Sequence, residues 1–282
     1  MARRLCYSTV PTFERDGLVL SYEDLGGPRE RTVVFLHGLL LSSEMMLPIA
    51  RAFHGEFRPV LLELHGHGKS SRPIEGSHYS MKTFGQDAIA LLDHLGVERA
   101  GFFGTSLGAD VSLAAMLGQP ARVAGAVLEM PVLERGAKFA RRMFRPVAMM
   151  LRRRSAPKAL ALAARRLPDL RFYPGFKESL AILAANPVSG AAVIEGLLAT
   201  AEEGHSWEEI DRCPVPALVI GHPRDPLHTF GDADELARRL PNGRLVRARS
   251  ILELRLRPER IVGASKQFLN RCFTQESGRA TA

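Results

Sequence analysis

A serine lies between two glycines where a predicted strand passes into a predicted helix. Residues 104–108, Gly-Thr-Ser-Leu-Gly, match the pattern G-x-S-x-G. The apolar run Ala100–Phe103 predicts the strand, and the stretch from Leu107 to Leu117 predicts the helix. Small residues suit a strained backbone with close neighbours, and a helix N-terminus stabilises developing negative charge. We therefore interpret Ser106 as a nucleophile, the alternative being a turn of small residues with no chemistry.

A nucleophilic serine needs a base that takes its proton and donors that hold the oxyanion. His228 is a candidate base, because it follows the predicted strand Ala217–Gly221 by a few residues. Asp225 lies three residues before His228, so the two side chains could compete for the same space. Glu129, at the end of the strand Val123–Leu128, would then be the acid partner of His228.

Two further interpretations stay open. The base could come from elsewhere, such as His37 or a carboxylate acting through water. Alternatively, the catalytic group has decayed and the pocket binds a small lipophilic ligand or a partner without turnover, since loss of the base alone removes several orders of magnitude of rate.

Strand-like and helix-like segments alternate along most of the chain, beginning with a hairpin at Asp16-Gly17 and a helix over Ser43–Phe53 capped by Ser43. This alternation predicts an α/β fold, with a mostly parallel sheet flanked by helices. From residue 132 to residue 206 the pattern becomes all-helical. We expect a core domain in two parts, 1–131 and 207–282, with a helical cap at 132–206 over the carboxyl ends of the strands.

At this point the sequence resembles the α/β-hydrolase superfamily, over about Phe13 to Phe273. The stretch 35–38, Phe-Leu-His-Gly, is similar to the family's strand followed by a His-Gly loop. The resemblance implies that the backbone N–H groups of Leu39 and Leu107 form the oxyanion hole. It also implies that Asp225, in the stretch 220–226, is the acid of a catalytic triad. A serine at the nucleophile position argues against epoxide hydrolase or dehalogenase chemistry, which uses Asp there in the same fold.

Two stretches depart from the family pattern. The turn 63–70 has Glu63 and His65 where the family has Asp and Arg. The family's triad histidine should lie near Ile251, on the loop before the closing helix, but no histidine follows His228 in the chain. The identity of the base is therefore the open question of the sequence.

The remaining histidines favour structural or surface positions. His65 and His67 belong to a Gly-rich turn, whereas four others are expected on exposed helices or loops, namely His54, His78, His94 and His205. No pair has metal-ligand spacing with a carboxylate in register, so we expect no metal and no cofactor.

Composition favours an ordinary globular protein. The 282 residues are 46% hydrophobic and 24% charged, and no apolar run reaches the length of a membrane span. No secretory signal is evident, and Cys6, Cys213 and Cys272 suggest neither a disulfide framework nor a metal cluster. We expect a cytoplasmic protein, and the sequence indicates no oligomeric state.

The net charge of +8 belongs to one segment. Between Val132 and Phe172, twelve Lys and Arg residues face only Glu134 and Asp169. The simplest explanation is a cap helix with solvated arginines, kinked or broken at Pro146. The sharper hypothesis is contact with an anionic membrane surface or with a phosphate-bearing substrate, such as a coenzyme A or carrier-protein thioester. No nucleic-acid recognition module accompanies the charge, so nucleic acid is not expected.

The function predicted from the sequence is therefore serine-dependent hydrolysis of a small carboxylic ester or thioester with a hydrophobic acyl group. Ser106 would be the nucleophile and His228 the base. The alternative is the catalytically impaired binding protein described above.

Overall fold

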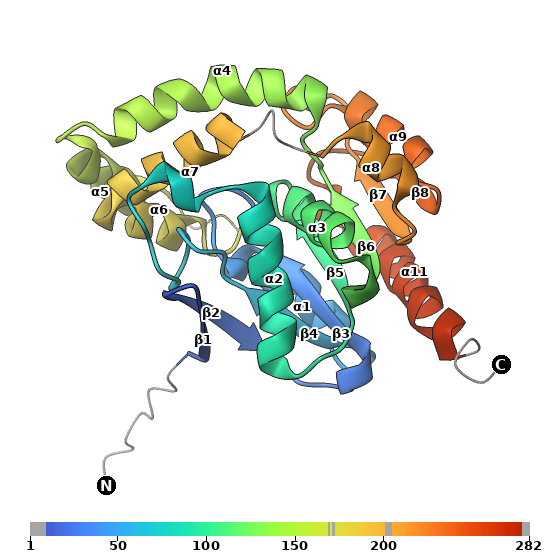
Figure 1. Ribbon diagram of the computed structural model, residues 1–282. Helices are drawn as coiled ribbons and strands as arrows, with labels where there is room; N and C mark the ends of the chain where they lie inside the picture. The colour runs from blue at the N-terminus through green and yellow to red at the C-terminus, as the bar shows by residue number, and fades with distance from the viewer. Residues whose placement is uncertain (1–9, 169, 171–172, 201–204, 278–282) are drawn as a thin grey trace, which may run out of the picture.

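An eight-stranded sheet forms the centre of the molecule in the computed structural model, which describes residues 10–168, 170, 173–200 and 205–277 (Figure 1). The strand order is β1-β2-β4-β3-β5-β6-β7-β8. β2 is antiparallel to both of its neighbours, β1 and β4, and the remaining strands, from β4 through β3 to β8, are parallel to one another. The strands are β1 Thr12–Arg15, β2 Leu18–Asp24, β3 Thr32–Leu36, β4 Arg58–Leu62, β5 Ala100–Thr105, β6 Val123–Glu129, β7 Ala217–Gly221 and β8 Gly243–Arg247. The expected α/β fold with a mostly parallel sheet is confirmed.

Helices cover both faces of this sheet. One face packs against α2 Met81–Leu95, α3 Leu107–Gly118, α8 Trp207–Arg212 and α9 Phe230–Arg239. The other packs against α1 Leu47–Phe53, α10 Glu253–Leu256 and α11 Glu259–Ser277. Short 3-10 turns complete the core at η1 Arg29–Arg31, η2 Ser43–Met46, η3 Gly76–His78 and η4 Pro120–Arg122. Because both faces are covered, the central strands are apolar throughout, as the continuous run of β3 predicts.

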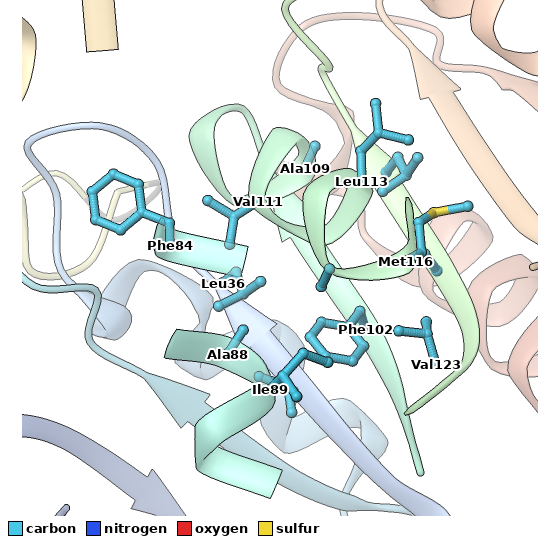
Figure 2. Packing of buried hydrophobic residues seen from close by; sticks show 14 of the residues in the cluster. Leu36, Phe84, Ala88, Ile89, Phe102, Ala109, Val111, Leu113, Met116 and Val123 are labelled. Carbon is cyan, nitrogen blue, oxygen red and sulfur yellow. The ribbon is translucent and has the colours of Figure 1, made fainter. Parts of the chain in front are cut away.

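Close packing fixes the strand that leads to the serine. Phe102 of β5 lies among side chains of α2 and α3, including Ile89 and Met116, all fully or nearly fully buried (Figure 2). On the opposite face Phe103 stacks on Phe35 of β3 with ring centroids 5.5 Å apart. Because side chains pack tightly against both faces of β5, the end of this strand is held in place, and so is the start of the turn that follows it.

Several local signals act as the sequence indicates. Asp16 and Gly17 both have positive φ, which suits the tight turn of the β1–β2 hairpin. The Ser80 side chain accepts from the Thr83 N–H and caps α2, which ends at the left-handed Gly96. The expected cap at Ser43 is wrong: this serine lies inside η2, and α1 begins only at Leu47. A 3-10 turn takes up the first residues of the expected helix because Pro48 suits only the start of an α-helix.

Four helices lie in the described part of the segment 132–206, as its all-helical pattern predicts: α4 Glu134–Leu151, α5 Ala156–Arg166, α6 Phe176–Ala185 and α7 Pro187–Thr200. They have a small core of their own, in which Ala148 and Leu151 of α4 pack against Ala191 and Ile194 of α7. Of the kink or break expected at Pro146, the break is wrong, since α4 continues through this residue and forms a long arch above the sheet (Figure 1). Cys6, Asp169 and Arg171 lie outside the described residues.

Membrane-span criteria are not met by any single helix in the described part of the chain. Only α6 and α7 taken together, bent by 100° at their junction, have the required length and composition. Most of α7 is buried inside the protein.

Candidate active site

Ser106 occupies a strained turn between β5 and α3. Its φ of 54° and ψ of −117° are unusual for a residue with a side chain. The turn is possible because Gly104 and Gly108 let backbones approach: a Cβ on Gly104 would lie 2.0 Å from the Gly108 oxygen, and one on Gly108 would lie 2.1 Å from the Leu36 oxygen. The Ser106 N–H donates to the Glu129 carbonyl at 2.8 Å, which ties the turn to β6. The hydroxyl thus projects at the N-terminus of α3.

The position of this turn in the sheet is equally specific. Leu36 of β3 pairs with Gly104 of β5, so the loops after these two strands meet at the same edge. The chain order reverses between β3 and β5, and ligands bind at such switch points in open parallel sheets. The loop after β3 carries Leu39, which is half-buried beside the serine turn.

His228 reaches Ser106 from the loop that follows β7. Its Nε2 lies 2.9 Å from the Ser106 Oγ, and its Nδ1 lies 2.8 Å from Asp225 Oδ2. The carboxylate accepts the Nδ1 proton, which leaves Nε2 with a free lone pair to accept a hydrogen bond from the serine hydroxyl. The three side chains therefore form one hydrogen-bonded line in the order Ser106, His228, Asp225.

A tight turn brings Asp225 and His228 together instead of making them compete. Asp225 Oδ1 accepts the backbone N–H groups of Leu227 and His228, both at 3.0 Å, while Oδ2 accepts from the ring. Arg224, just before, has a φ of 63° that starts the turn. Burial alone would raise the pKa of Asp225, but the hydrogen bonds and the charge of His228, together with the backbone donors, lower it to about 2. The carboxylate is ionised at neutral pH.

Glu129 lies in a different polar cluster, immediately behind the serine turn. Its Oε2 accepts from the Thr105 hydroxyl at 2.6 Å and from Arg255 Nη2 at 3.1 Å, and its Oε1 lies 3.2 Å from His222 Nε2. Burial would raise its pKa, but Arg255, His222 and Thr105 lower it to about 2. The structure therefore pairs Glu129 with Arg255 and His222, and pairs Asp225 with His228.

The loop after β8 supplies Arg255 in place of a histidine. Ile251, at the position where the family pattern places its histidine, is 45% exposed and lies away from the core. Arg255, four residues later, enters the interior, where its side chain is 5% exposed beside a Glu129 side chain that is 1% exposed. The sequence analysis missed this residue. A signal was present in Glu129, because a carboxylate at the end of a buried strand needs a cationic partner.

Both ring nitrogens of His37 form hydrogen bonds with backbone groups. Its Nδ1 donates to the Gly38 carbonyl at 2.9 Å, and its Nε2 accepts the Leu64 N–H at 3.2 Å. Burial, the largest influence, lowers its pKa and keeps the ring neutral. Both ring nitrogens are engaged in holding the loop after β3.

A cavity of about 770 Å³ opens beside Ser106. This volume suits a small organic ligand. Leu39 and Leu107, whose N–H groups the resemblance assigns to the oxyanion, line it together with the serine. The other walls come mainly from α4, α7 and α8 and are largely apolar, including Ala140, Phe144, Ile194, Leu197, Leu198, Trp207 and Ile210.

The sequence did not indicate that two polar residues, Asp110 and His205, line this cavity. Asp110 is buried one turn into α3, and its Oδ1 accepts the Val132 N–H at 3.0 Å; burial raises its pKa well above the usual range. His205, expected on the surface, is wrongly assigned, because it is largely buried against the Asp110 backbone. His54, His78 and His94 are exposed, as expected. The burial of His205 follows from the packing of the helical insertion, which sequence periodicity does not reveal.

Metal-binding side chains are not clustered in the described residues: no group of three or more His, Cys, Asp or Glu is arranged to hold an ion. His65 instead pairs with the buried Asp87, and its other nitrogen contacts the His78 carbonyl at 3.0 Å. Glu63 accepts the N–H groups of Ser43 and Lys69, so this turn is held by internal hydrogen bonds.

Comparison with known families identifies the fold. The alpha/beta hydrolase fold family model matches residues 31–172, which is half of the chain and includes the serine turn. The chain belongs to the α/β-hydrolase family. Among curated proteins, 3-oxoadipate enol-lactonase 2 from Acinetobacter baylyi is 25% identical over 241 residues, covering 83% of this chain and 86% of the relative.

Solved α/β-hydrolase structures superpose over nearly the whole chain. A hydrolase from Pseudomonas aeruginosa has a TM-score of 0.76 at 25% identity, covering 93% of this chain and 99% of its own. The enol-lactonase from Burkholderia xenovorans has a TM-score of 0.73 at 22% identity, covering 92% of this chain and 100% of its own, and shows the fold. The relatives are named hydrolases, and they support hydrolysis of ester-type substrates by this α/β-hydrolase.

Proposed function

We propose that the protein is a serine hydrolase of carboxylic esters or thioesters with a hydrophobic acyl group. The observation that carries the proposal is the hydrogen-bonded line from Ser106 Oγ through both nitrogens of His228 to Asp225, with distances of 2.9 and 2.8 Å. Nucleophile, base and orienting acid are the three components that activate a serine hydroxyl. Asp225 is the proposed acid, and Glu129 is proposed to support the turn from behind.

The reaction would begin when the Ser106 oxygen attacks the carbonyl carbon as its proton passes to His228 Nε2. The carbonyl oxygen becomes an oxyanion, which the Leu39 and Leu107 N–H groups would bind. The C–O or C–S bond then breaks, and the leaving group takes the proton from His228. A water molecule, deprotonated by the same nitrogen, releases the acid from the acyl-enzyme. Asp225 keeps the imidazole oriented and stabilises it while it is charged.

Substrate preference would come from the cavity. The wall opposite Ser106 is built from apolar residues of α4 and α7, such as Phe144, Ile194 and Leu197, which favour a hydrophobic acyl group. We propose that the helices between β6 and β7 act as a cap over the site, because they supply this wall. Lactones are cyclic esters and would be cleaved by the same steps, in line with the enol-lactonase named among the relatives.

A fluorophosphonate probe tests the proposal directly, because it reacts only with an activated serine. The wild-type protein should be labelled, and Ser106→Ala should be unlabelled. His228→Ala should fold normally and lose labelling by a factor of about 10³ or more, since the base activates the nucleophile. Ser112→Ala is a matched control, because Ser112 is buried in α3 with its hydroxyl bonded to the Gly108 carbonyl at 2.7 Å.

Steady-state hydrolysis of p-nitrophenyl acetate, butyrate and octanoate then tests the acyl preference. The value of kcat/KM should rise from acetate to octanoate. An unlabelled wild-type protein that binds octanoate in the same cavity would instead identify a catalytically impaired binding protein.

A further inference from the structure

The outer surface of α4 and α5 is strongly cationic. Apart from Arg135, Arg141 and Arg152, eight Lys and Arg side chains are exposed on these helices and their connection: Lys138, Arg142, Arg145, Arg153, Arg154, Lys158, Arg165 and Arg166. None of the eight makes an ion pair within the part of the chain that the structure describes. The single acid from residue 134 to residue 166 is Glu134, which accepts from Trp207 Nε1 at 2.7 Å. The charge of these eight side chains is therefore not balanced by an acid in the part of the chain that the structure describes.

Large apolar side chains are exposed on the same helices. Their exposed fractions are 39% for Phe139, 65% for Met149, 49% for Met150 and 46% for Leu162. Along α4, Lys138, Arg142, Arg145 and Met149 follow at intervals of four, three and four residues, so they share one face. The opposite face of α4 packs inward, with Ala148 and Leu151 buried against α7. Basic and apolar side chains thus lie together on the outward side.

We propose that this face of α4 and α5 docks on a bilayer that contains anionic phospholipid. An amphipathic surface of this kind inserts apolar side chains at the headgroup level while Lys and Arg bind lipid phosphates. Solvation by water accounts for the exposed arginines, but it does not account for Met149 and Met150, whose apolar surface would be exposed with no compensating contact. A nucleic acid would bind the same Lys and Arg side chains through its phosphates, but its backbone has no apolar surface that could cover the exposed apolar side chains of α4 and α5. The bilayer is the partner whose chemistry uses both.

The docking face and the cavity share one helix. Ala140 and Phe144 line the cavity from the inner side of α4, and Lys138 contributes to both the cavity and the outer surface. Docking would therefore bring the cavity close to lipid-dissolved molecules. Binding to vesicles does not depend on the proposed hydrolysis, so the two proposals fail separately.

Sedimentation with sucrose-loaded vesicles provides the test. At 50 mM NaCl the wild-type protein should bind vesicles of phosphatidylcholine with 30% phosphatidylglycerol at least tenfold better than pure phosphatidylcholine, and 500 mM NaCl should abolish the difference. The variant Arg142→Gln, Arg145→Gln, Arg153→Gln should lower the partition coefficient about a hundredfold. Met149→Ser with Met150→Ser should lower it about tenfold, because their apolar surface no longer enters the membrane.

A control triple replaces exposed basic residues on other helices, Arg51→Gln, Lys82→Gln and Arg271→Gln, and should change binding less than twofold. All variants alter exposed side chains, and their melting temperatures confirm folding. Equal binding to neutral and anionic vesicles, or an equal loss in the control triple, would overturn the proposal. So would tight binding of a 20-base-pair DNA duplex that the arginine triple abolishes and the methionine variant leaves unchanged, because the face would then belong to nucleic acid.

Discussion

Two carboxylates lie near the serine turn, the partly buried Asp225 and the fully buried Glu129, and substituting each by its amide separates their roles. In Asp225→Asn, the amide can still accept the N–H groups of Leu227 and His228 through its oxygen, so the turn survives. Its NH₂ group cannot accept the His228 Nδ1 proton, which favours the tautomer with the proton on Nε2. Nε2 then has no lone pair for the Ser106 proton. We expect kcat to fall by about 10⁴, with a loss of stability of no more than about 2 kcal/mol, because the pKa of this carboxyl falls only from 3.8 to about 2 on folding.

Glu129→Gln should instead lose stability and keep most of its kcat. Arg255 is almost completely buried against this carboxylate, and removing one partner of a buried ion pair costs about 3–5 kcal/mol. The pKa gives a similar magnitude: a carboxyl whose pKa falls from 4.5 to about 2 on folding stabilises the folded state by about 3 kcal/mol at neutral pH. Because this pKa is depressed, the contribution is present above pH 4.5 and is lost as the pH falls through 2. The amide variant lacks it at every pH.

The measurement pairs urea unfolding with p-nitrophenyl butyrate hydrolysis, the latter at a temperature where both variants are fully folded. Asp225→Asn should lose activity with the smaller shift of its unfolding midpoint, whereas Glu129→Gln should lose more stability and keep kcat within about tenfold. The assignment of the acid is refuted if Glu129→Gln loses more kcat than Asp225→Asn does.

Three further changes test other parts of the structure. Burial and a hydrogen bond with Glu178 raise the pKa of Glu44 to about 7. The protonated Glu44 side chain therefore stabilises the folded protein at low pH, and this contribution is lost as the pH rises through 7. In differential scanning calorimetry, Glu44→Gln should raise Tm by about 2 °C at pH 8.5 and have little effect at pH 5. Gly108→Ala should destabilise the protein by about 3 kcal/mol in urea unfolding, because its Cβ would collide with the Leu36 carbonyl; an unchanged midpoint would contradict the described turn. Ala140→Trp should fill part of the cavity and reduce kcat/KM at least tenfold for the octanoate ester but less than threefold for the acetate, and equal losses would show that acyl groups bind elsewhere.

The sequence predicts well those features that depend on short segments. The G-x-S-x-G pattern, a preceding apolar run and a following helix place Ser106 correctly at the end of β5, because all three signals lie within one short segment. The succession of strands and helices along the chain follows from the alternating patterns in the same way, whereas the order of the strands within the sheet does not. Contacts between distant segments are not encoded so locally. Arg255 and Glu129 are 126 residues apart, and no periodicity relates them.

The pairing of Asp225 with His228 shows a second limit. Three residues of separation suggest crowding when only the sequence is considered, yet the outcome depends on the backbone. Once Arg224 adopts a positive φ, the Asp225 carboxylate accepts the Leu227 and His228 N–H groups, and the imidazole turns back onto the remaining oxygen. One turn therefore holds both the acid and the ring that it orients.

In the proposed triad, this turn leaves the loop after β8 with no need for a histidine. In the geometry observed, His228 arrives at Ser106 from the β7 side with its orienting carboxylate on the same loop, so the β8 loop is free to take another role. It contributes Arg255, which neutralises Glu129 behind the serine turn and contacts the Thr105 hydroxyl at 3.2 Å. The double variant Ile251→His with His228→Ala should therefore fail to restore activity, because position 251 is exposed and Glu129 is already bound to Arg255. Recovery of more than about 1% of wild-type kcat in this double variant would show that the β8 loop still holds the geometry of a catalytic histidine, and the argument from Arg255 would fail.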